Sequence, residues 1–462
     1  MPPEMTSDAT PAPKPGPGNR REQIGWYFYD WANSAFGTTV ATVFLGPYIS
    51  NLARAAAGPD ELARFFGIPV AADSFLPYCI SFSVILQVLF LPILGAIADY
   101  SNLRKKLMQI FAVAGSVATM FMFFVTAGTW WLGGLLFIVA NLSFGAAIVF
   151  YNAFLPDIAA PEDRDRVSSV GWALGYLGGG LLLALNLVFY LVRDTMGVDT
   201  GLAVRINLFS GGLWWFAWSF VTWKMLRSRG VTRALPAGET YLSTGLKQLW
   251  ATGKEAAKYP HTIRFLIAYL LYNDGIQTVF AVAAVFAAAP LAQGGLAIEQ
   301  GMLTQVILMM QFVAFAGALL FGRVATRIGA KKALIIGLIV WTVVVIYSYL
   351  GLQEESRFLE FWILGACIAL VMGGTQAVSR GLFANMIPPG KEAEFFSIYE
   401  VSERGTSWLG PLAFGLVNQI TGSLRPAIVS IILFFVVGLV LLRRVDVRRA
   451  IAESGNRPPA VI

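Results

Sequence analysis

Charge and metal-binding side chains are scarce in this sequence. Only 13% of its 462 residues are Asp, Glu, Lys or Arg, whereas soluble domains contain about a quarter. There are two cysteines, Cys79 and Cys367, and one histidine, His261. Both cysteines lie in apolar runs, where a free cysteine packs as a small apolar side chain. We therefore expect no disulfide, no zinc or other metal site, and no cofactor.

The motifs of several enzyme classes are also absent. The sequence contains no GxxxxGKS/T loop, which argues against ATP-driven pumping. It contains no GxSxG nucleophile elbow and no HExxH zinc motif. A membrane enzyme would need convergent nucleophile, base or metal groups, and one histidine at a loop edge does not supply them. The sequence thus predicts a protein that is not an enzyme.

Long apolar runs take the place of charged surface. The chain is 56% hydrophobic, with a mean hydropathy of +0.65. About 20 apolar residues in a helix cross a bilayer core of ~30 Å, and a helix satisfies its own backbone hydrogen bonds in lipid. The sequence therefore predicts an all-α integral membrane protein with about twelve transmembrane helices. The predicted spans are residues 24–49, 74–98, 107–127, 130–153, 167–192, 205–226, 262–288, 300–322, 331–351, 360–384, 395–420 and 424–443.

The basic residues that give the net charge of +7 are unevenly divided among the connections between the predicted spans. Lys and Arg gather in both tails and in alternate connections, whereas the intervening loop at 352–360 carries three glutamates against one arginine. Positive charge concentrates on the cytoplasmic side of membrane proteins. We therefore expect both termini in the cytoplasm, a lipid bilayer around the apolar surface, and no nucleic acid as partner. The basic clusters are residues 20–21, 104–106, 224–233, 323–332 and 443–449.

The chain repeats itself around a long central loop. Three pairs of segments share their pattern of aromatic, amide, glycine, proline or basic residues, and they follow in the same order. Such order predicts two six-helix parallel repeats with a substrate site between them near mid-membrane. The pairs are 26–36 with 269–280, 95–106 with 322–332, and 151–164 with 381–394.

These repeats set the expected domain boundaries. The first residues lack the apolar stretch of a signal peptide and are rich in Pro, Gly and Ala, so we expect a disordered tail. Within the central loop, residues 241–258 have the pattern of an amphipathic surface helix. The boundaries are a cytoplasmic tail 1–23, a first half 24–226, a cytoplasmic central loop 227–260, a second half 261–443 and a cytoplasmic tail 444–462.

Several of these segments resemble a known family. GAIADYSNLRKK, at 95–106, resembles the loop signature of the major facilitator superfamily. YDWANSAF, YNAFLPDIA, GYLGGG, YNDGIQT and SRGLFANMIPPGKEAEFF together resemble the autophagy-related vacuole effluxer branch, over about 24–443. The resemblance implies a twelve-helix secondary transporter of the major facilitator fold, with amino-acid export linked to fungal members. It also implies that Asp99, Arg104 and Lys105 lock the cytoplasmic side in the outward-facing state, and that the lock is asymmetric because Thr326 stands where the first half has Asp99.

Asp274 is an acid near the middle of the seventh predicted span. It lies about twelve residues into that span, ~18 Å deep at 1.5 Å per residue. A charge there costs ~2.5–3.5 kcal/mol on insertion scales, and removal from water favours the neutral form of a carboxyl group. One interpretation is a site for a proton or for a cationic substrate group; the other is an acid that holds helices together. We expect Tyr272, Asn273 and Gln277 to shape the same pocket.

Asp30 lies in the first span, nearer the cytoplasmic rim. Asn33, Ser34 and Thr38 follow it at spacings of three, four and eight, which places them on its helix face. Such a stripe predicts a wall of the central cavity. The alternative is an ion pair at the gate, with Arg380 or Arg404.

Further polar groups are predicted at the cytoplasmic ends of the tenth and eleventh spans. Glu400, Glu403, Arg404 and Arg380 serve either as a charge relay or substrate clamp, since Arg binds carboxylates through two hydrogen bonds, or as an intracellular gate. The amides Asn152 and Gln376 add hydrogen-bonding groups for substrate, although such groups are also common interhelical ties. The many Phe and Trp side chains are expected to face lipid or its interfaces for the most part.

The sequence therefore predicts a monomeric secondary carrier that binds a small-molecule substrate. The favoured substrate, which the family resemblance implies, is an amino acid, moved by proton-linked or facilitative efflux across a bacterial inner membrane by alternating access of the two halves. A lipid or lysophospholipid exporter on the same fold is the alternative. A lipid exporter requires an apolar lateral opening between the halves, whereas a carrier of small solutes requires a closed polar pocket.

Overall fold

The computed structural model of the chain is almost entirely helical. Each predicted span falls on one helix or on consecutive helices. Residues 1–18 of the predicted tail 1–23 and nearly all of the segment 241–258 lie outside the described residues. The structure describes residues 19–57, 62–99, 103–227, 247, 258–288, 296–298, 300–350, 356–404, 409–421 and 424–462.

The first half begins with a helix that changes its winding. α1 (Arg20–Ala35) continues directly into a π-helical stretch, η1 (Phe36–Phe44), and then into α2 (Leu45–Ala55). The helix therefore starts at Arg20 rather than at the predicted residue 24. The other elements of this half are α3 (Ala72–Asp99), α4 (Arg104–Phe121), η2 (Met122–Phe124), η3 (Ala127–Thr129), α5 (Trp130–Asn152), α6 (Leu155–Ile158), α7 (Arg164–Val192), η4 (Arg193–Met196) and α8 (Thr200–Met225).

The second half divides two of its predicted spans. The eleventh predicted span comprises α14 and α15, and the twelfth comprises α16 and α17. The helices of this half are α10 (Pro260–Ala288), α11 (Gln300–Ile328), α12 (Ala330–Leu350), α13 (Arg357–Asn385), α14 (Glu392–Arg404), α15 (Leu409–Thr421), α16 (Leu424–Ser430), α17 (Ile432–Arg443) and α18 (Val447–Glu453).

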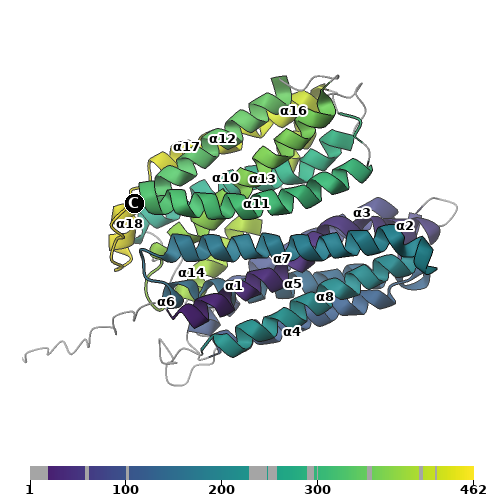
Figure 1. The fold of residues 1–462 in the computed structure, drawn as a ribbon, viewed down its shortest axis with the longest axis horizontal. Coiled ribbons are helices and arrows are strands. Elements are labelled where there is room, and N and C mark those ends of the chain that lie inside the picture. The colour runs from purple at the N-terminus through teal and green to yellow at the C-terminus, as the bar shows by residue number, and fades with distance from the viewer. Residues whose placement is uncertain are drawn as a thin grey trace, which may run out of the picture.

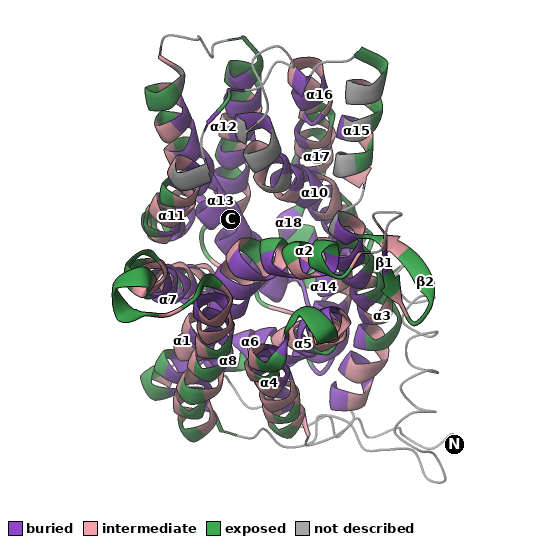
Figure 2. Cartoon of the chain, turned by 90° about the vertical axis from the view of Figure 1, so that its right-hand side faces the viewer, coloured by how far each residue is buried: buried purple, intermediate pink, exposed green. Residues whose placement is uncertain are grey.

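The outer surface of these helices is apolar. Among the described residues, eight helical segments are long and apolar enough to cross a membrane. Large apolar side chains such as Leu185, Leu191 and Leu433 are exposed on them, and Figure 2 shows buried residues along the inner faces of the bundles. An apolar exterior of this extent suits lipid and not water. The fold is that of an all-α integral membrane protein.

The two halves form two bundles that meet along a seam. In Figure 1, α1 to α8 lie in the lower bundle, the labelled helices α10 to α13, α16 and α17 lie in the upper one, and α14 reaches down beside α6 and α1. α7 and α11 run side by side along the seam, α13 packs on α7, and α14 packs on α3. The first half thus holds a helix of the second, because α14 lies against α3 and α5 as well as against α10.

A short hairpin is the exception to the all-α prediction. β1 (Leu62–Phe65) pairs antiparallel with β2 (Ile68–Ala71) in the connection between α2 and α3. The turn residues Phe66 and Gly67 have φ values of 48° and 88°. Two successive positive φ values are typical of the turns that suit the twist of a hairpin, and glycine adopts them without strain.

The predicted tail 444–462 is folded onto the second half. Asp446 caps α18 by accepting a hydrogen bond from the Arg449 backbone N–H at 3.0 Å, and this bond lowers the pKa of Asp446 below its ordinary value. The side-chain amide of Asn456 donates to the carbonyl oxygens of Asn385 (3.1 Å) and Ile387 (2.6 Å). The C-terminal segment therefore covers the end of α13.

Candidate functional site

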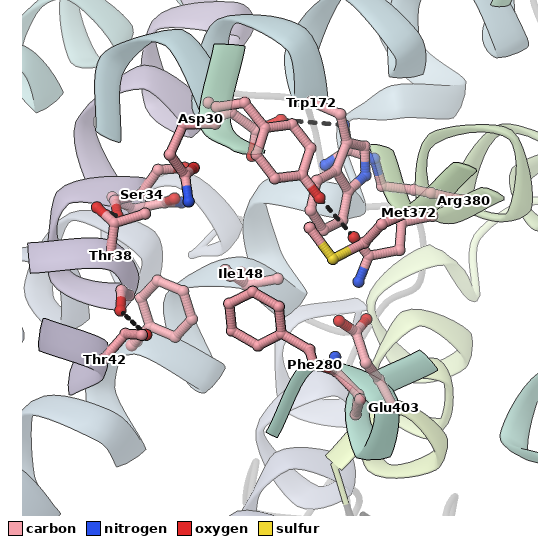
Figure 3. A pocket seen from close by; sticks show the side chains of 18 of the residues that line it. Asp30, Ser34, Thr38, Thr42, Ile148, Trp172, Phe280, Met372, Arg380 and Glu403 are labelled. Carbon is pink, nitrogen blue, oxygen red and sulfur yellow. Dashed lines mark hydrogen bonds and ion pairs between the residues drawn. The ribbon is translucent and has the colours of Figure 1, made fainter. Parts of the chain in front are cut away.

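A cavity of about 250 Å³ lies between the two halves. α1, η1, α5 and α7 line it from the first half, and α10, α11, α13 and α14 line it from the second. Figure 3 shows Asp30, Trp172 and Arg380 grouped at one end, with Thr42 at the other. The lining residues are Asp30, Asn33, Ser34, Gly37, Thr38, Thr42, Phe144, Ile148, Asn152, Trp172, Gly175, Tyr176, Gln277, Phe280, Ile307, Gln311, Met372, Gln376, Arg380, Tyr399, Glu400 and Glu403.

The polar stripe of the first helix faces this cavity. Asp30, Asn33 and Thr38 all line it, as their shared helix face predicts. The stripe continues into η1, where the Thr42 hydroxyl donates to the Gly37 carbonyl at 2.8 Å, a bond across five residues. π-helical turns are rare and occur frequently at functional sites, so the altered winding belongs to the part of the helix that shapes the cavity.

Glycines of α7 let this helix approach α1. A Cβ atom at Gly171 would lie 2.6 Å from the Trp26 ring and 2.8 Å from Asp30 Oδ2. A Cβ atom at Gly178 would lie 2.6 Å from the Trp31 carbonyl oxygen. Small residues at a helix interface permit such close approach, so the segment 171–180, GWALGYLGGG, packs α7 tightly against the helix that carries Asp30.

Arg380 reaches from α13 into the first half. Its Nη2 lies 3.0 Å from Asp30 Oδ2 and donates to the Ser168 carbonyl at 2.9 Å. Its Nε donates to Ser168 Oγ at 2.9 Å, and its Nη1 donates to Asn152 Oδ1 at 3.3 Å. A buried ion pair overcomes its desolvation only when further hydrogen bonds surround it, and these bonds meet that condition. Of the two partners considered for Asp30, the structure places Arg380 beside it; the side chain of Arg404 lies outside the described residues.

Three aromatic rings surround the Arg380 guanidinium. Its central carbon lies 4.7 Å from the ring centroid of Trp26, 5.2 Å from that of Trp172 and 5.7 Å from that of Tyr151. A cation this close to a ring face is attracted by the ring quadrupole. The expectation that most Phe and Trp side chains face lipid does not hold for Trp26 and Trp172. Trp26 precedes Asp30 by one helical turn, and this spacing is the signal in the sequence that could have placed it at the site.

Other predicted binding residues also link the two halves. Asn152 Nδ2 donates to Glu400 Oε1 at 3.0 Å, and the Tyr176 hydroxyl donates to Gln376 Oε1 at 2.6 Å. Within the second half, Glu403 Oε2 accepts a hydrogen bond from the Tyr269 hydroxyl at 3.0 Å. Amide, hydroxyl and carboxylate groups from both halves therefore converge on one cavity, together with Gln277 and Gln311.

Three predicted pocket residues do not line the cavity. The Tyr272 hydroxyl lies 2.7 Å from Ser379 Oγ, the Asn273 side-chain amide donates to the Glu403 carbonyl at 3.3 Å, and Asp274 Oδ2 accepts the Gly410 N–H at 2.7 Å. All three side chains are buried inside the second half. Successive helix positions are turned by about 100°, and Gln277 is the member of this group that faces the cavity.

A second cluster ties the halves where α3 ends and α14 begins. The Asp99 carboxylate accepts the backbone N–H groups of Ala393 (3.1 Å) and Glu394 (2.8 Å). Arg104 Nη2 lies 3.1 Å from Asp99 Oδ1 and 3.1 Å from Glu392 Oε2. The Asp99 carboxylate thus lies at the N-terminus of α14, where the helix dipole favours negative charge. Asp99 and Arg104 lie together on the seam.

Two further basic residues of this region differ in their partners: Lys105 bonds within the first half, and Arg164 bonds across to the second. Lys105 Nζ donates to the Leu226 carbonyl at 2.6 Å within the first half, so the structure does not place it between the halves. Arg164, which was not predicted, lies on the seam and donates from Nη1 to Asn385 Oδ1 at 3.0 Å. It is the first residue of α7 and directly precedes Asp165, and its position in the sequence gave no indication of its partner.

Comparison with known proteins identifies the family. The family model described as "Vacuole effluxer Atg22 like" matches residues 18–455. The chain belongs to this family. It is 30% identical to the MFS-type transporter YxiO of Bacillus subtilis (strain 168), over 91% of this chain and 94% of that protein. It is 28% identical to Autophagy-related protein 22-1 of Penicillium rubens, over 94% and 91% of the respective chains.

Solved structures confirm the fold of this Atg22-like chain. The human organic anion transporter MFSD10 (TETRAN) superposes with a TM-score of 0.69 at 15% identity, over 92% of this chain and 99% of that one. A bacterial homologue of the iron transporter ferroportin in the outward-facing state gives a TM-score of 0.65 at 12% identity, over 92% and 98%. The chain therefore has the major facilitator fold, and it is a multi-pass membrane transporter and not an enzyme.

Proposed function

We propose that this Atg22-like protein moves a small polar solute by alternating access, with amino acids as the substrate class and efflux from the cytoplasm as the direction. The cavity between the halves carries the proposal. Both halves supply its polar groups, which include Asp30, Arg380 and Glu400 together with several amides. The carboxylates suit the ammonium group of an amino acid, and the side-chain amides can donate hydrogen bonds to its carboxylate.

The size of the cavity supports a small solute. Pockets that hold drug-sized ligands have volumes of roughly 300–1,000 Å³, and this cavity has about 250 Å³. Its apolar wall, which includes Phe144, Ile148, Phe280 and Ile307, can accept an apolar side chain beside the charged end. A lipid exporter would need room for acyl chains, so the geometry favours an amino acid over the lipid alternative.

Alternating access requires the two clusters that tie the halves, one around Arg380 and one around Asp99, to break and re-form. Asp99, Arg104 and Arg164 join the halves at the ends where α3 finishes and α4 and α7 begin. Those ends lie on the predicted cytoplasmic side, so the structure corresponds to a state closed to the cytoplasm. We propose that the protein is a monomer in a bacterial inner membrane, with both termini in the cytoplasm.

Asp274 is the proposed proton carrier, set apart from the solute. Its Oδ2 accepts one backbone N–H, from Gly410, and its Oδ1 has no hydrogen-bond partner among the described residues. Acids buried in membrane helices commonly mark proton relays. Gly410 is the second residue of α15, so protonation of Asp274 would act on α15 through this hydrogen bond.

Transport in proteoliposomes tests the proposal. Uptake and efflux of a labelled amino-acid mixture are measured with and without an imposed pH gradient, for wild type, Asp274→Asn and the control Asp194→Asn, which alters an exposed carboxylate of η4. We expect gradient-driven transport in wild type and control, and only exchange in Asp274→Asn. Absence of any amino-acid movement in wild type would overturn the substrate, and intact gradient-driven transport in Asp274→Asn would overturn its role as proton carrier.

A further inference from the structure

Arg380 occupies a site that belongs wholly to the other half. The guanidinium partners described above are a carboxylate, a hydroxyl, a backbone carbonyl and a side-chain amide on α1, α5 and α7, and three rings on the same helices. α13, which carries Arg380, belongs to the second half. We name this group the cation socket; it consists of Trp26, Asp30, Tyr151, Asn152, Ser168 and Trp172.

Separation of the halves leaves the cation socket without its cation. Arg380 is 3% exposed and pairs with an Asp30 side chain that is 11% exposed. Opening the cytoplasmic side draws α13 away from α1 and α7, so Asp30 loses its partner and water enters from the cytoplasm. The Asp30 carboxylate, the neighbouring acceptors and the ring faces then favour a cation from that water in place of the guanidinium.

The chemistry of the socket indicates which cation this is. Asp30 Oδ2 and the Ser168 carbonyl oxygen accept hydrogen bonds from Arg380 Nη2, and Asn152 Oδ1 accepts one from the adjacent Nη1. An ammonium group has three N–H donors for such acceptors. The rings of Trp26, Trp172 and Tyr151 attract an organic cation through their faces. A proton on Asp30 would use neither the rings nor the other acceptors, so the socket suits an alkylammonium or guanidinium group.

We propose that the cation socket binds the ammonium or guanidinium group of the transported solute when the cytoplasmic side is open, and that Arg380 displaces this group when that side closes. The inference rests on the proposed function and names its substrate class as a cationic or zwitterionic amine. Asp30, Asn152 and Trp172 line the central cavity, so the displaced solute enters the part of the cavity that faces away from the cytoplasm. Arg380 thus acts as a tethered competitor that favours export.

Binding of small cations to the full-length protein tests the exchange. The probes are propylguanidinium, propylammonium and the anion butyrate, titrated against wild type, Arg380→Gln and Asp30→Asn in lipid nanodiscs. Tryptophan fluorescence reports binding, because Trp26 and Trp172 belong to the socket. We expect Arg380→Gln to bind both cations at least about tenfold more tightly than wild type, since removing a competitor raises the available fraction of the site. Asp30→Asn should bind neither cation.

Arg164→Gln is the matched control. Arg164 is also a buried arginine on the seam, and it bonds to Asn385 and not to the socket. The Arg164→Gln variant loosens the closed state without emptying the socket, so its gain in cation affinity should be smaller than that of Arg380→Gln. Equal gains in the two variants would attribute the effect to opening alone and overturn the exchange.

A role of Arg380 in binding the substrate directly would give a different result in these titrations. If Arg380 clamps a substrate carboxylate, Arg380→Gln would lose butyrate binding and gain no cation affinity, which would overturn the proposal. Arg380→Lys, which keeps the charge on a shorter side chain, should give an intermediate affinity and serves if Arg380→Gln does not fold. These titrations measure binding and need no transport. Absence of amino-acid movement in proteoliposomes would therefore reject the proposed function, and the titrations would still decide whether the socket binds cations.

Discussion

At the scale of single residues, Gly171 determines how closely α7 can approach the Asp30–Arg380 pair. A methyl group at this position would meet the Trp26 ring at 2.6 Å, Asp30 Oδ2 at 2.8 Å and Arg380 Nη2 at 3.0 Å. Overpacking of a filled interior costs about 1–3 kcal/mol. We therefore expect Gly171→Ala to lower the thermal unfolding midpoint in detergent and to slow transport. Gly128→Ala is the control, because no atom lies within 4 Å of a Cβ there, and an equal loss in both variants would contradict the argument.

In the proposed mechanism, closure of the cytoplasmic side depends most directly on Asp99. Asp99→Ala leaves two backbone N–H groups of α14 without their acceptor and removes one of the three carboxylates that pair with Arg104. Leaving a buried donor unsatisfied costs about 1–3 kcal/mol, and this cost falls on the closed state. We expect a cysteine at Ser397, a buried position of α14, to react faster with maleimide added from the cytoplasmic side.

The background for that measurement needs only Cys79 and Cys367 replaced by serine. Asp194→Ala, which removes an exposed carboxylate from η4, should leave the labelling rate at Ser397→Cys unchanged. Labelling that stays slow in Asp99→Ala would show that Asp99 does not hold the cytoplasmic side closed.

Asp30 and Asp274 show how far residue patterns predict a site. Both are carboxylates in apolar helices with polar residues three and four positions on, Asn33 and Ser34 after Asp30 and Gln277 and Thr278 after Asp274. In the first helix the polar stripe extends to Thr38, and that whole face lines the cavity. Asp274 stands among adjacent polar residues that cannot all face one way, and which of them faces inward depends on packing against α13 to α15. The partners of Arg380 likewise depend on contacts between halves, which no local pattern contains.

At the scale of elements, α14 packs against α3 through a position without a side chain. A Cβ atom at Gly95 would lie 2.5 Å from the Ala393 carbonyl oxygen. This obstacle is backbone, so α14 itself would have to move. We expect Gly95→Val to hold the two helices apart, to favour the cytoplasm-open state and to increase cytoplasmic labelling at Ser397→Cys. Gly46→Ala is the control, since its added Cβ meets only Leu76 Cδ2 at an ordinary 3.7 Å; unchanged labelling in Gly95→Val would contradict the prediction.

The elements themselves differ in how well the sequence predicts them. The spans follow from apolar length, because a membrane helix must satisfy its own backbone. The β1–β2 hairpin is too short for such a signal and depends on the backbone conformation of Phe66 and Gly67. The π-helical winding of Phe36–Phe44 changes the hydrogen-bond register without changing the composition of the span, so hydropathy does not reveal it.

At the scale of the whole molecule, the two halves repeat in sequence but close asymmetrically. Asp99 of the first half bonds to the start of α14 in the second. Thr326 stands at the corresponding position of the second half, and its hydroxyl donates to the Arg323 carbonyl within its own helix. Gly322 of the same helix, α11, approaches α7 closely, with a Cβ position 2.6 Å from Ser169. Helices of the two halves therefore approach closely in both copies of the motif, but only the first copy has the carboxylate.

This asymmetry predicts that a second lock can be added. Thr326 and Arg166 line the same hollow between α11 and α7, so Thr326→Asp places a carboxylate near an arginine and near the first turn of α7, where negative charge is favoured. A partly exposed pair of this kind contributes about 0.2–1 kcal/mol, and it does so only while the cytoplasmic side is closed. We expect slower solute exchange in proteoliposomes, slower cytoplasmic labelling at Ser397→Cys, and weakening of both effects at high salt. Thr326→Asn, which has the same shape without the charge, should behave as wild type; equal slowing by Asn would mean that bulk, and not a second electrostatic lock, delays the opening of the halves.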